Sequence, residues 1–288
     1  MFEVNKSILK NIYKEKPIDS KKYDYGLVLV IGGSQFYSGS PALASVAAFR
    51  TGVDMVRIIA PKRAADIIAS LSPNLAAFPL EGDWLEKKHL ATLISMTEGA
   101  KDVSHGKTAV VIGGGTGRTA ETQEVILEYL SQVSVPVVID ADAIHAIGKN
   151  CKLFSGKNFL ITPNVHEFFI LTGKEVFGLT EDQKIKMVEE EARCLGNTIL
   201  LKGVADIISD GKETAVVRAG SPYMSKGGCG DTLAGVCGAL LARGISPFEA
   251  AQAGSFINSK AGELASKKLK EGMLATDLIK AIPEILHM

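Results

Sequence analysis

The sequence predicts a doubly wound α/β protein, in which helices cover both faces of a mostly parallel sheet. Apolar runs of strand length recur along the 288 residues, and segments with helical spacing separate most of them. Strands that are buried on both faces are continuously apolar, and their alternation with helices is typical of a parallel sheet. A hydrophobic share of 46% can supply the large core that such a fold needs.

The predicted elements follow one another along the whole chain. Strands are predicted at residues 26–33, 55–60, 108–114, 136–141, 158–162, 197–203, 204–209 and 214–220. Helices are predicted between most of them, at residues 41–52, 62–72, 119–133 and 181–196. Residues 236–269 predict two consecutive helices, whose many small residues permit close packing on the sheet. No linker or repeat interrupts the pattern, so we expect a single domain over residues 1–288, with a helical lead-in over residues 1–25.

Charge and composition exclude several classes of protein. Lys plus Arg and Asp plus Glu both number 32, so the net charge indicates neither a nucleic-acid partner nor a membrane surface. The first residues contain no apolar signal-peptide core, and no segment reaches the roughly 18 apolar residues that a membrane helix needs. The four cysteines form no CxxC pair, so neither structural zinc nor a disulfide framework is expected. We expect a cytoplasmic enzyme that acts on a small molecule.

The segment GGCGDTLAG, residues 227–235, places glycines directly before a predicted helix. Gly227, Gly228 and Gly230 let the backbone approach a ligand closely, and the N–H groups at a helix N-terminus attract an anion such as a phosphate. Asp231 is either the N-cap of this helix or a general base that takes a proton from a substrate hydroxyl beside the anion. The cluster of glycines favours the catalytic interpretation.

In ITPNVHEFFILTG, residues 161–173, a predicted strand ends and a helix begins. Asn164 and Glu167 would share one helical face, where their oxygen atoms could hold a hydrated Mg²⁺ near phosphates. The alternative is a capping box, with Asn164 as N-cap and Glu167 three residues later, and the residues alone favour it. His166 lies between them and is either a ligand contact or an ordinary surface residue.

Other predicted strands also end in acidic, basic or glycine-rich segments. Asp140 and Asp142 could hold a divalent cation or a ribose hydroxyl, unless Asp142 only caps a short helix. Residues 111–118, VIGGGTGR, allow close backbone approach but match neither a Walker motif nor a complete dinucleotide fingerprint. Lys202 lies in a tight turn between two strands, where it either neutralises a phosphate or is solvated. Because ligands bind beyond the carboxyl ends of parallel strands, we expect the site there.

These segments together resemble the ribokinase-like NAD(P)H-hydrate dehydratases. The resemblance covers about residues 26–265, and its motifs follow one another in the order and spacing of that family. The motifs are GGSxxYSGSPALASVAAFRTGVDMVRI, VIGGGTG, VIDADAI, LITPNVHEF, LLKGVAD and GGCGDTLAGV. The resemblance implies a three-layer α/β/α ribokinase-like fold. It also implies a hydro-lyase for nicotinamide nucleotide repair, which dehydrates (S)-NAD(P)H-hydrate, the 6-hydroxy adduct, with ADP or ATP as co-substrate. Phosphoryl transfer activates the hydroxyl, because phosphate leaves far better than hydroxide.

The resemblance assigns a role to each matching residue. Asp231 is the base that activates the hydroxyl, while Gly227, Gly228 and Gly230 stabilise the transferring phosphoryl group. The implied nucleotide contacts are Lys202, Gly203, Val204, Ala205, Asp206, Gly227, Gly228, Cys229 and Gly230. The implied contacts to the hydrated coenzyme are Gly39, Ser40, Gly117, Asn164, Val165, His166, Glu167, Phe168 and Asp231. Asn164 and Glu167 match the N-x-x-E magnesium motif of ribokinase-like enzymes and are expected to hold Mg²⁺ through water.

Some positions depart from the family's usual pattern. Residues 162–167 resemble the eukaryotic form of the motif, residues 113–117 replace the usual G-P-G-L-G, and Cys229 stands where Thr or Ser is usual. These changes leave the base in place and leave the choice between ADP and ATP open. About 25 residues precede the first predicted strand, so we expect no fused epimerase domain of the kind that many relatives carry. We therefore expect a separate NAD(P)H-hydrate epimerase to act on the same pool, and a homo-oligomer because relatives are often oligomers.

Two other functions stay open at this point. A small-molecule kinase of the same fold, for a hydroxymethylpyrimidine, a hydroxyethylthiazole or a sugar, would use the same base. A small closed pocket would favour the kinase, whereas a dinucleotide needs a long open groove. The third candidate is a nucleotide-binding regulator without turnover, and the set of Asn164, Glu167 and Asp231 argues against it.

Overall fold

A ten-stranded sheet runs through the centre of the molecule. The computed structural model describes residues 1–288, apart from the side chains of residues 149, 151 and 152. The strands are β1 (Phe2–Glu3), β2 (Leu27–Ile31), β3 (Met55–Pro61), β4 (Ala76–Leu80), β5 (Thr108–Ile112), β6 (Val137–Ile139), β7 (Phe159–Ile161), β8 (Thr198–Leu201), β9 (Asp206–Ser209) and β10 (Thr214–Val217). They lie in the order β1-β10-β9-β8-β7-β6-β5-β2-β3-β4. Only the β8–β9 and β9–β10 pairs are antiparallel, so the predicted mostly parallel sheet is confirmed.

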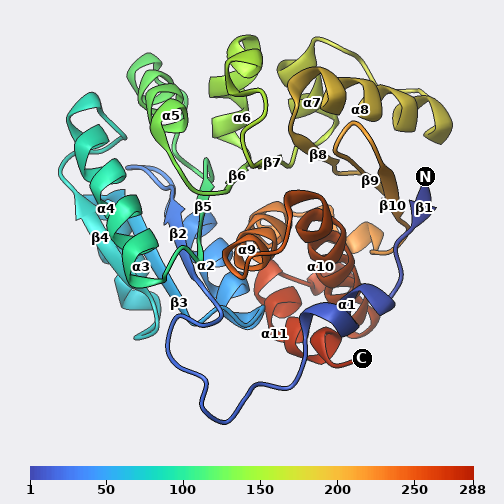
Figure 1. Cartoon of the computed structure of the whole chain (residues 1–288), viewed down its shortest axis with the longest axis horizontal. Coiled ribbons are helices and arrows are strands. Elements are labelled where there is room, and N and C mark those ends of the chain that lie inside the picture. Colours follow the sequence, from blue (N-terminus) through green and yellow to red (C-terminus); the bar gives the residue numbers. More distant parts are fainter.

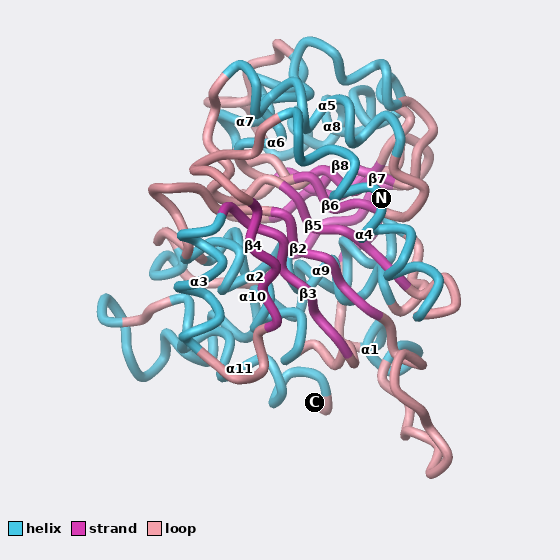
Figure 2. The backbone as a smooth tube through the Cα atoms, turned by 90° about the vertical axis from the view of Figure 1, so that its left-hand side faces the viewer, coloured by secondary structure: helices cyan, strands magenta, loops and turns pink.

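Helices cover the two faces of this sheet and make three layers (Figures 1 and 2). One layer contains α4 (Leu90–Val103), α5 (Ala120–Gln132), α6 (Asp142–Ile147), α7 (Val165–Thr172) and α8 (Glu181–Leu195). The other contains α1 (Ser7–Ile12), α2 (Gly39–Arg50), α3 (Lys62–Leu71), α9 (Cys229–Ala242), α10 (Pro247–Leu269) and α11 (Ala275–Leu286). Short 3-10 helices are η1 (Lys87–His89), η2 (Gly148–Phe154), η3 (Pro222–Met224) and η4 (Lys270–Gly272). Among the described residues, no helix is long and apolar enough to cross a membrane.

The strands are apolar along their whole length because both faces of each strand are buried. In β2, Val28 and Val30 pack into the layer of α2 and α9, whereas Leu29 and Ile31 pack into the layer of α4 and α5. All five residues of β2 are buried. Burying such a side chain stabilises the fold by about 1.5–3 kcal/mol. The sheet is therefore held between two apolar cores, and its strand ends are free to carry polar groups.

Helices α2 and α9 pack unusually close to each other. A Cβ atom on Gly235 of α9 would lie 2.7 Å from the carbonyl carbon of Ala44 on α2. Only glycine permits this approach, because any side chain would overlap the backbone of the neighbouring helix. The predicted pair of small-residue helices, α9 and α10, is confirmed. The close packing brings the first turns of α2 and α9 together on one face of the sheet.

Some elements were not predicted from the sequence. Strand β4 has the sequence AAFPL and pairs only with β3, so its proline lies at a sheet edge, where a missing N–H is tolerated. Strand β1 has two residues, too few for a pattern. Within residues 1–25 only Ser7–Ile12 is α-helical. Tyr13 then ends the helix, and its hydroxyl donates to the carbonyl of Thr51.

Candidate active site

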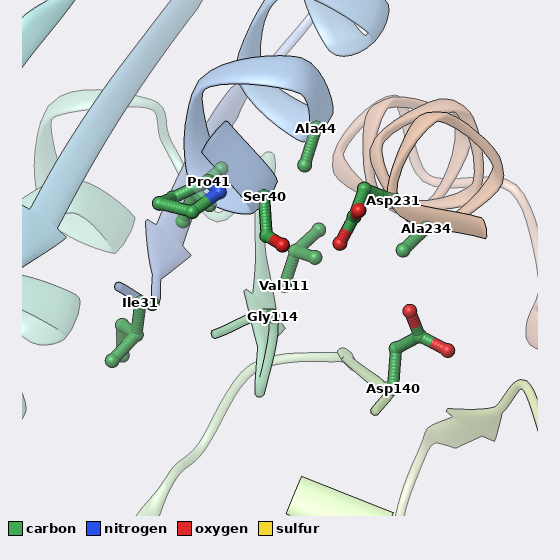
Figure 3. A pocket seen from close by; sticks show the side chains of 11 residues that line it. Ile31, Ser40, Pro41, Ala44, Val111, Gly114, Asp140, Asp231 and Ala234 are labelled. Carbon is green, nitrogen blue, oxygen red and sulfur yellow. The ribbon is translucent and has the colours of Figure 1, made fainter. Parts of the chain in front are cut away.

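Asp231 lies in the first turn of α9 and faces the first turn of α2. The N-cap of α9 is Gly228, with a left-handed φ of +97°, so the interpretation of Asp231 as N-cap is wrong. Its carboxylate accepts a hydrogen bond from the hydroxyl of Ser40, and the two side chains point toward each other in Figure 3. A carboxylate that is not needed as a cap is available to accept a proton from a ligand.

Burial changes the acidity of this carboxylate. The pKa of Asp231 is raised to about 7. Desolvation is the main cause and the negative charge of Asp140 adds to it, whereas the hydrogen bond from Ser40 and the charge of Lys202 oppose the shift. A cavity of about 10 Å³, large enough for one water molecule, is lined by Ser40, Asp140 and Asp231. A base with a pKa near 7 accepts and releases protons readily at neutral pH.

Lys202 joins the acidic residues of the site. Its ammonium nitrogen lies 2.8 Å from Oδ1 of Asp140 and 3.5 Å from Oε2 of Glu167. Thr162 donates to the same Oδ1 atom at 2.9 Å. Burial alone would lower the pKa of Lys202, but Asp140 and Glu167 outweigh it and raise that pKa above its ordinary value. The lysine therefore presents a positive charge inside the site.

This positive charge lies beside the N-terminus of α9. The ammonium nitrogen of Lys202 would be 3.5 Å from a Cβ atom on Gly230. A helix N-terminus carries a partial positive charge, and its glycines leave the backbone accessible. The thiol of Cys229 is buried, and burial raises its pKa, so it is a neutral group here. The predicted glycine segment and the predicted lysine thus lie next to each other, and both contribute positive charge.

The segment that begins α7 adopts the predicted capping box. Asn164 Oδ1 accepts from the N–H of Glu167 at 2.9 Å, and Glu167 Oε2 accepts from the N–H of Asn164 at 2.8 Å. Asn164, Val165 and His166 line an open cavity of about 450 Å³. Phe168 was expected to contact the coenzyme, but its side chain is fully buried in the core. Only the backbone of Phe168 is left for such a contact.

The hairpin between β8 and β9 has the predicted tight turn. Asp206 closes it, because its Oδ1 accepts from the N–H of Gly203 at 3.0 Å and its Oδ2 accepts from Ser255 at 2.7 Å. Val204 is fully exposed at the tip. Burial raises the pKa of Asp206. Both carboxylate oxygens are thus engaged within the protein, and Asp206 shapes the turn that positions Lys202.

The glycine-rich loop after β5 lies against Asp231. A Cβ atom on Gly114 would be 3.1 Å from Oδ1 of Asp231, so this glycine leaves room for the carboxylate. Asp142 Oδ2 accepts from the N–H of Gly117 at 2.9 Å, and Asp142 Oδ1 pairs with Arg118 at 2.7 Å. The alternative that Asp142 caps α6 is wrong, because the N-cap of α6 is Ala141. Its side chain fixes the neighbouring loop instead.

Two residues that line the open cavity were missed by sequence reasoning. Phe169 is 45% exposed, beside the buried Phe168, and Glu175 lines the same cavity. Consecutive residues of a helix point about 100° apart, so only one of two adjacent aromatic rings can face the core. That helical phase is the signal that would have identified Phe169.

Three carboxylates of the site lie near Lys202. Asp140, Glu167 and Asp231 all act electrostatically on the single ammonium of Lys202. Within the described side chains, no group of three His, Cys, Asp or Glu residues is arranged to hold a metal ion.

Comparison with known proteins identifies the family. The Carb_kinase family, described as NAD(P)H-hydrate dehydratase, matches residues 28–284. The bifunctional NAD(P)H-hydrate repair enzyme Nnr of Hyperthermus butylicus is 40% identical over 283 residues, which cover 96% of this chain and 51% of that protein. The ADP-dependent (S)-NAD(P)H-hydrate dehydratase of Nitrosopumilus maritimus is 34% identical over 281 residues, which cover 97% of this chain and 95% of that protein.

A solved structure confirms the fold. The ADP/ATP-dependent NAD(P)H-hydrate dehydratase of Bacillus subtilis, co-crystallised with ATP/Mg²⁺, superposes with a TM-score of 0.77 at 22% identity, over 98% of this chain and 96% of that one. The chain spans about half the length of the bifunctional relatives that it matches. It covers nearly all of the shorter relatives. On its sequence and its fold, the chain belongs to the Carb_kinase family of NAD(P)H-hydrate dehydratases.

Proposed function

We propose that this protein dehydrates (S)-NAD(P)H-hydrate to NAD(P)H, with ADP or ATP as co-substrate. One observation carries the proposal. Asp231, a carboxylate whose pKa is raised to about 7, lies at the N-terminus of α9, where the ammonium of Lys202 adjoins Gly230. A base and an anion site are thus adjacent, as a phosphoryl transfer to a hydroxyl requires. Relatives at 34–40% identity that carry dehydratase or repair-enzyme names support it.

In the first step the hydroxyl of the hydrate attacks the terminal phosphorus of the nucleotide. Asp231 takes the hydroxyl proton, a new oxygen–phosphorus bond forms, and the bond to the leaving AMP or ADP breaks. The backbone of residues 227–230 and the ammonium of Lys202 stabilise the negative charge on the transferring group. The group that accepts the proton is separate from the groups that stabilise the negative charge of the phosphoryl group, so the two roles do not compete.

In the second step the carbon–oxygen bond breaks and phosphate leaves with its electron pair. The nitrogen of the nicotinamide-derived ring supplies electrons to the carbon that loses phosphate, and the adjacent carbon then loses a proton. A double bond results, and the reduced nicotinamide ring is restored. Overall the hydrate and the nucleotide give NAD(P)H, a shortened nucleotide, phosphate and one proton.

The remaining site residues hold the two substrates. We assign the nucleotide to the turn from Lys202 to Asp206 together with Gly227–Gly230. We assign the hydrated coenzyme to Gly39, Ser40, Gly117 and the first turn of α7, from Asn164 to the backbone of Phe168. A side chain on Gly39 would meet no atom within 4 Å, so the start of α2 is open to a ligand.

Magnesium is the metal that this site suits. Asn164 and Glu167 would hold it through water, because the capping box already occupies one oxygen of each side chain. Asp140 would add negative charge nearby. When bound, Mg²⁺ would neutralise the phosphates of the nucleotide. Chelation with EDTA should then abolish turnover, and added Mg²⁺ should restore it.

A small-molecule kinase is not favoured. The relatives that this chain covers over nearly their whole length carry dehydratase names. The cavity beside Lys202 is open and measures about 450 Å³, unlike the small closed pocket that a thiazole would need. A true kinase would release a phosphorylated alcohol and would form no reduced nicotinamide.

Two partners complete the proposal. An NAD(P)H-hydrate epimerase would supply the S form from the same pool, and relatives that carry the bifunctional repair-enzyme name support this expectation. A homo-oligomer is expected, and light scattering of the purified protein would test it. Addition of an epimerase to a mixture of both hydrate forms should raise the extent of conversion from part of the hydrate to all of it.

The function is tested with purified protein, hydrated NADH or NADPH, and ADP or ATP. The near-ultraviolet absorbance of the reduced nicotinamide should return only when a nucleotide is present. Its rate with each of the four combinations gives the preference for nucleotide and coenzyme. If no absorbance returns with either nucleotide while a pyrimidine or thiazole alcohol is phosphorylated, the kinase is correct instead.

A further inference from the structure

Two aromatic side chains next to the site lie in solvent and have no role in the steps above. Phe36 is 79% exposed and Tyr37 is 53% exposed. Their rings form an edge-to-face pair with centroids 5.4 Å apart. Burying a phenylalanine side chain would stabilise a protein by about 1.5–3 kcal/mol, and the fold does not use that stabilisation for Phe36. Exposed aromatic groups of this kind are typical of surfaces that bind flat ligands.

The loop that carries these rings is held in place by hydrogen bonds. The N–H of Ser34 donates to the carbonyl of Tyr37 at 2.8 Å, and the N–H of Gln35 donates to the carbonyl of Asp83 at 2.7 Å. Arg63 donates to the carbonyl of Gln35 at 2.7 Å. The exposed rings therefore belong to a preorganised loop, and a ligand that binds them need not order it.

The aromatic pair adjoins the proposed catalytic base through the glycine-rich loop. A Cβ atom on Gly115 would be 2.7 Å from Cβ of Tyr37, while one on Gly114 would be 3.1 Å from Oδ1 of Asp231. Consecutive Cα atoms are about 3.8 Å apart, so a single peptide step separates the two contacts. A dinucleotide whose hydroxyl lies at Asp231 is long enough to reach these rings.

The position in the sheet separates this pair from the proposed nucleotide site. Phe36 and Tyr37 follow β2, whereas the turn that carries Lys202 follows β8, and β5, β6 and β7 lie between them. Four steps of about 4.8 Å give roughly 19 Å between the two strands. A co-substrate nucleotide bound at Lys202 would thus not occupy the β2 side of the site, where the coenzyme can bind.

We propose that Phe36, supported edge-to-face by Tyr37, forms a stacking platform for a flat ring of the hydrated coenzyme. The inference rests on the proposed function and names a specificity determinant of the same site. Stacking of a base on an aromatic side chain contributes about 1–3 kcal/mol, which corresponds to roughly 5- to 150-fold in affinity. The ring is either the adenine or the nicotinamide-derived ring of the coenzyme, and both offer a flat face.

The sole tryptophan of the chain provides a native probe of this platform. Trp84 packs on Gly117, and its loop is tied to the platform loop through Asp83 and Gln35. Bound NADPH absorbs where tryptophan emits, so titration with NADPH should quench the emission of Trp84. Phe36→Ala should weaken NADPH binding by about 5- to 150-fold, and Phe36→Tyr should restore most of it.

Kinetics separate this role from a structural one. For Phe36→Ala, the KM for the hydrate should rise by the same factor, while kcat and the KM for ADP or ATP stay close to the wild-type values. Phe177→Ala is the matched control, since Phe177 is 83% exposed in the connection after α7, and it should change none of these quantities. Two further titrations identify the ring: weaker binding of reduced nicotinamide mononucleotide indicates the nicotinamide-derived ring, and weaker binding of ADP-ribose indicates the adenine.

Several outcomes would overturn the platform. Unchanged NADPH affinity in Phe36→Ala, an equal loss in Phe177→Ala, or a rise confined to the KM for ADP or ATP would each exclude it. Failure of the proposed function has a different signature, because the wild-type protein would then convert no hydrate. The NADPH titration needs no turnover and reports on the platform in either case.

Discussion

The ammonium nitrogen of Lys202 donates a hydrogen bond of 2.8 Å to Oδ1 of Asp140, and both side chains are largely buried. Lys202 follows β8 and Asp140 follows β6, so the pair joins two strand ends across β7. An ion pair in this position stabilises little by itself, because removing both charges from water opposes their attraction. The pair matters because removal of either charge would leave the other one buried without a partner.

Replacement of Lys202 by methionine should therefore destabilise the fold. The carboxylates of Asp140 and Glu167 would keep their burial and lose their only ammonium partner within the described cluster. Leaving one member of a buried pair unpaired typically destabilises a protein by about 3–5 kcal/mol. Urea unfolding at neutral pH should show this loss.

The double variant Lys202→Met with Asp140→Asn should recover part of the loss, because it removes both charges of the shorter pair and leaves only Glu167 without its ammonium partner. Lys62→Met provides the control, since the pair of Lys62 with Asp66 is 54% and 58% exposed and its removal should change stability little. Equal urea midpoints for Lys202→Met and the wild type would contradict the argument.

Much of the fold could be predicted from the sequence because its strands are buried on both faces. Continuous apolar runs such as residues 27–31 identify a parallel sheet without any knowledge of its partners. Strand β4 could not be predicted, because an edge strand with alanine and proline has no such signal. The order of the strands also stayed hidden, since residues 108–112 pair with residues 27–31 far away along the chain.

The candidate site was predictable where one segment carries the information. The glycines before α9 and the acid among them indicated an anion site and a base from local chemistry alone. What local chemistry could not give is the choice between alternatives. Asn164 and Glu167 proved to be a capping box, and Asp142 proved to fix a loop 25 residues earlier. Those outcomes depend on three-dimensional neighbours that no single segment contains.

Activity should depend on pH through Asp231. Burial raises its pKa to about 7, and Asp140 contributes to the shift. A general base works only when deprotonated, so kcat/KM should fall about tenfold per unit below about pH 7 and level off above it. Asp140→Asn removes one cause of the raised pKa and should move this midpoint to lower pH. A flat profile through neutral pH, or a shift to higher pH, would exclude Asp231 as the base.

Asp231→Asn should separate catalysis from stability. Loss of the base should reduce turnover by about 10²- to 10⁴-fold, while nucleotide binding persists because the glycines and Lys202 remain. The pKa is raised above the ordinary 3.8, so ionisation of the buried acid destabilises the native state increasingly from about pH 4 to about pH 7. The free energy of unfolding of the variant should therefore exceed that of the wild type by on the order of 1–3 kcal/mol at pH 8, and the two should be equal near pH 4. Turnover within a few-fold of the wild type would remove Asp231 from its role.

Gly235→Ala should damage the site from a distance. The added Cβ would lie 2.7 Å from the carbonyl carbon and 2.8 Å from the Cα of Ala44, so α2 and α9 must separate. Overpacking of this kind destabilises by about 1–3 kcal/mol. Separation also pulls Ser40 on α2 away from Asp231 on α9, and kcat should fall with stability.

Gly99→Ala is the matched control for this substitution. Gly99 lies within α4, and a Cβ atom there meets nothing within 4 Å. Alanine is the better helix former, so Gly99→Ala should stabilise by about 0.5–1 kcal/mol and leave kcat unchanged. Thermal unfolding and the dehydration assay, run on both variants, compare the same chemical change on a packed and an open helix face. If Gly235→Ala kept wild-type kcat despite lower stability, the spacing of α2 and α9 would not control the contact between Ser40 and Asp231.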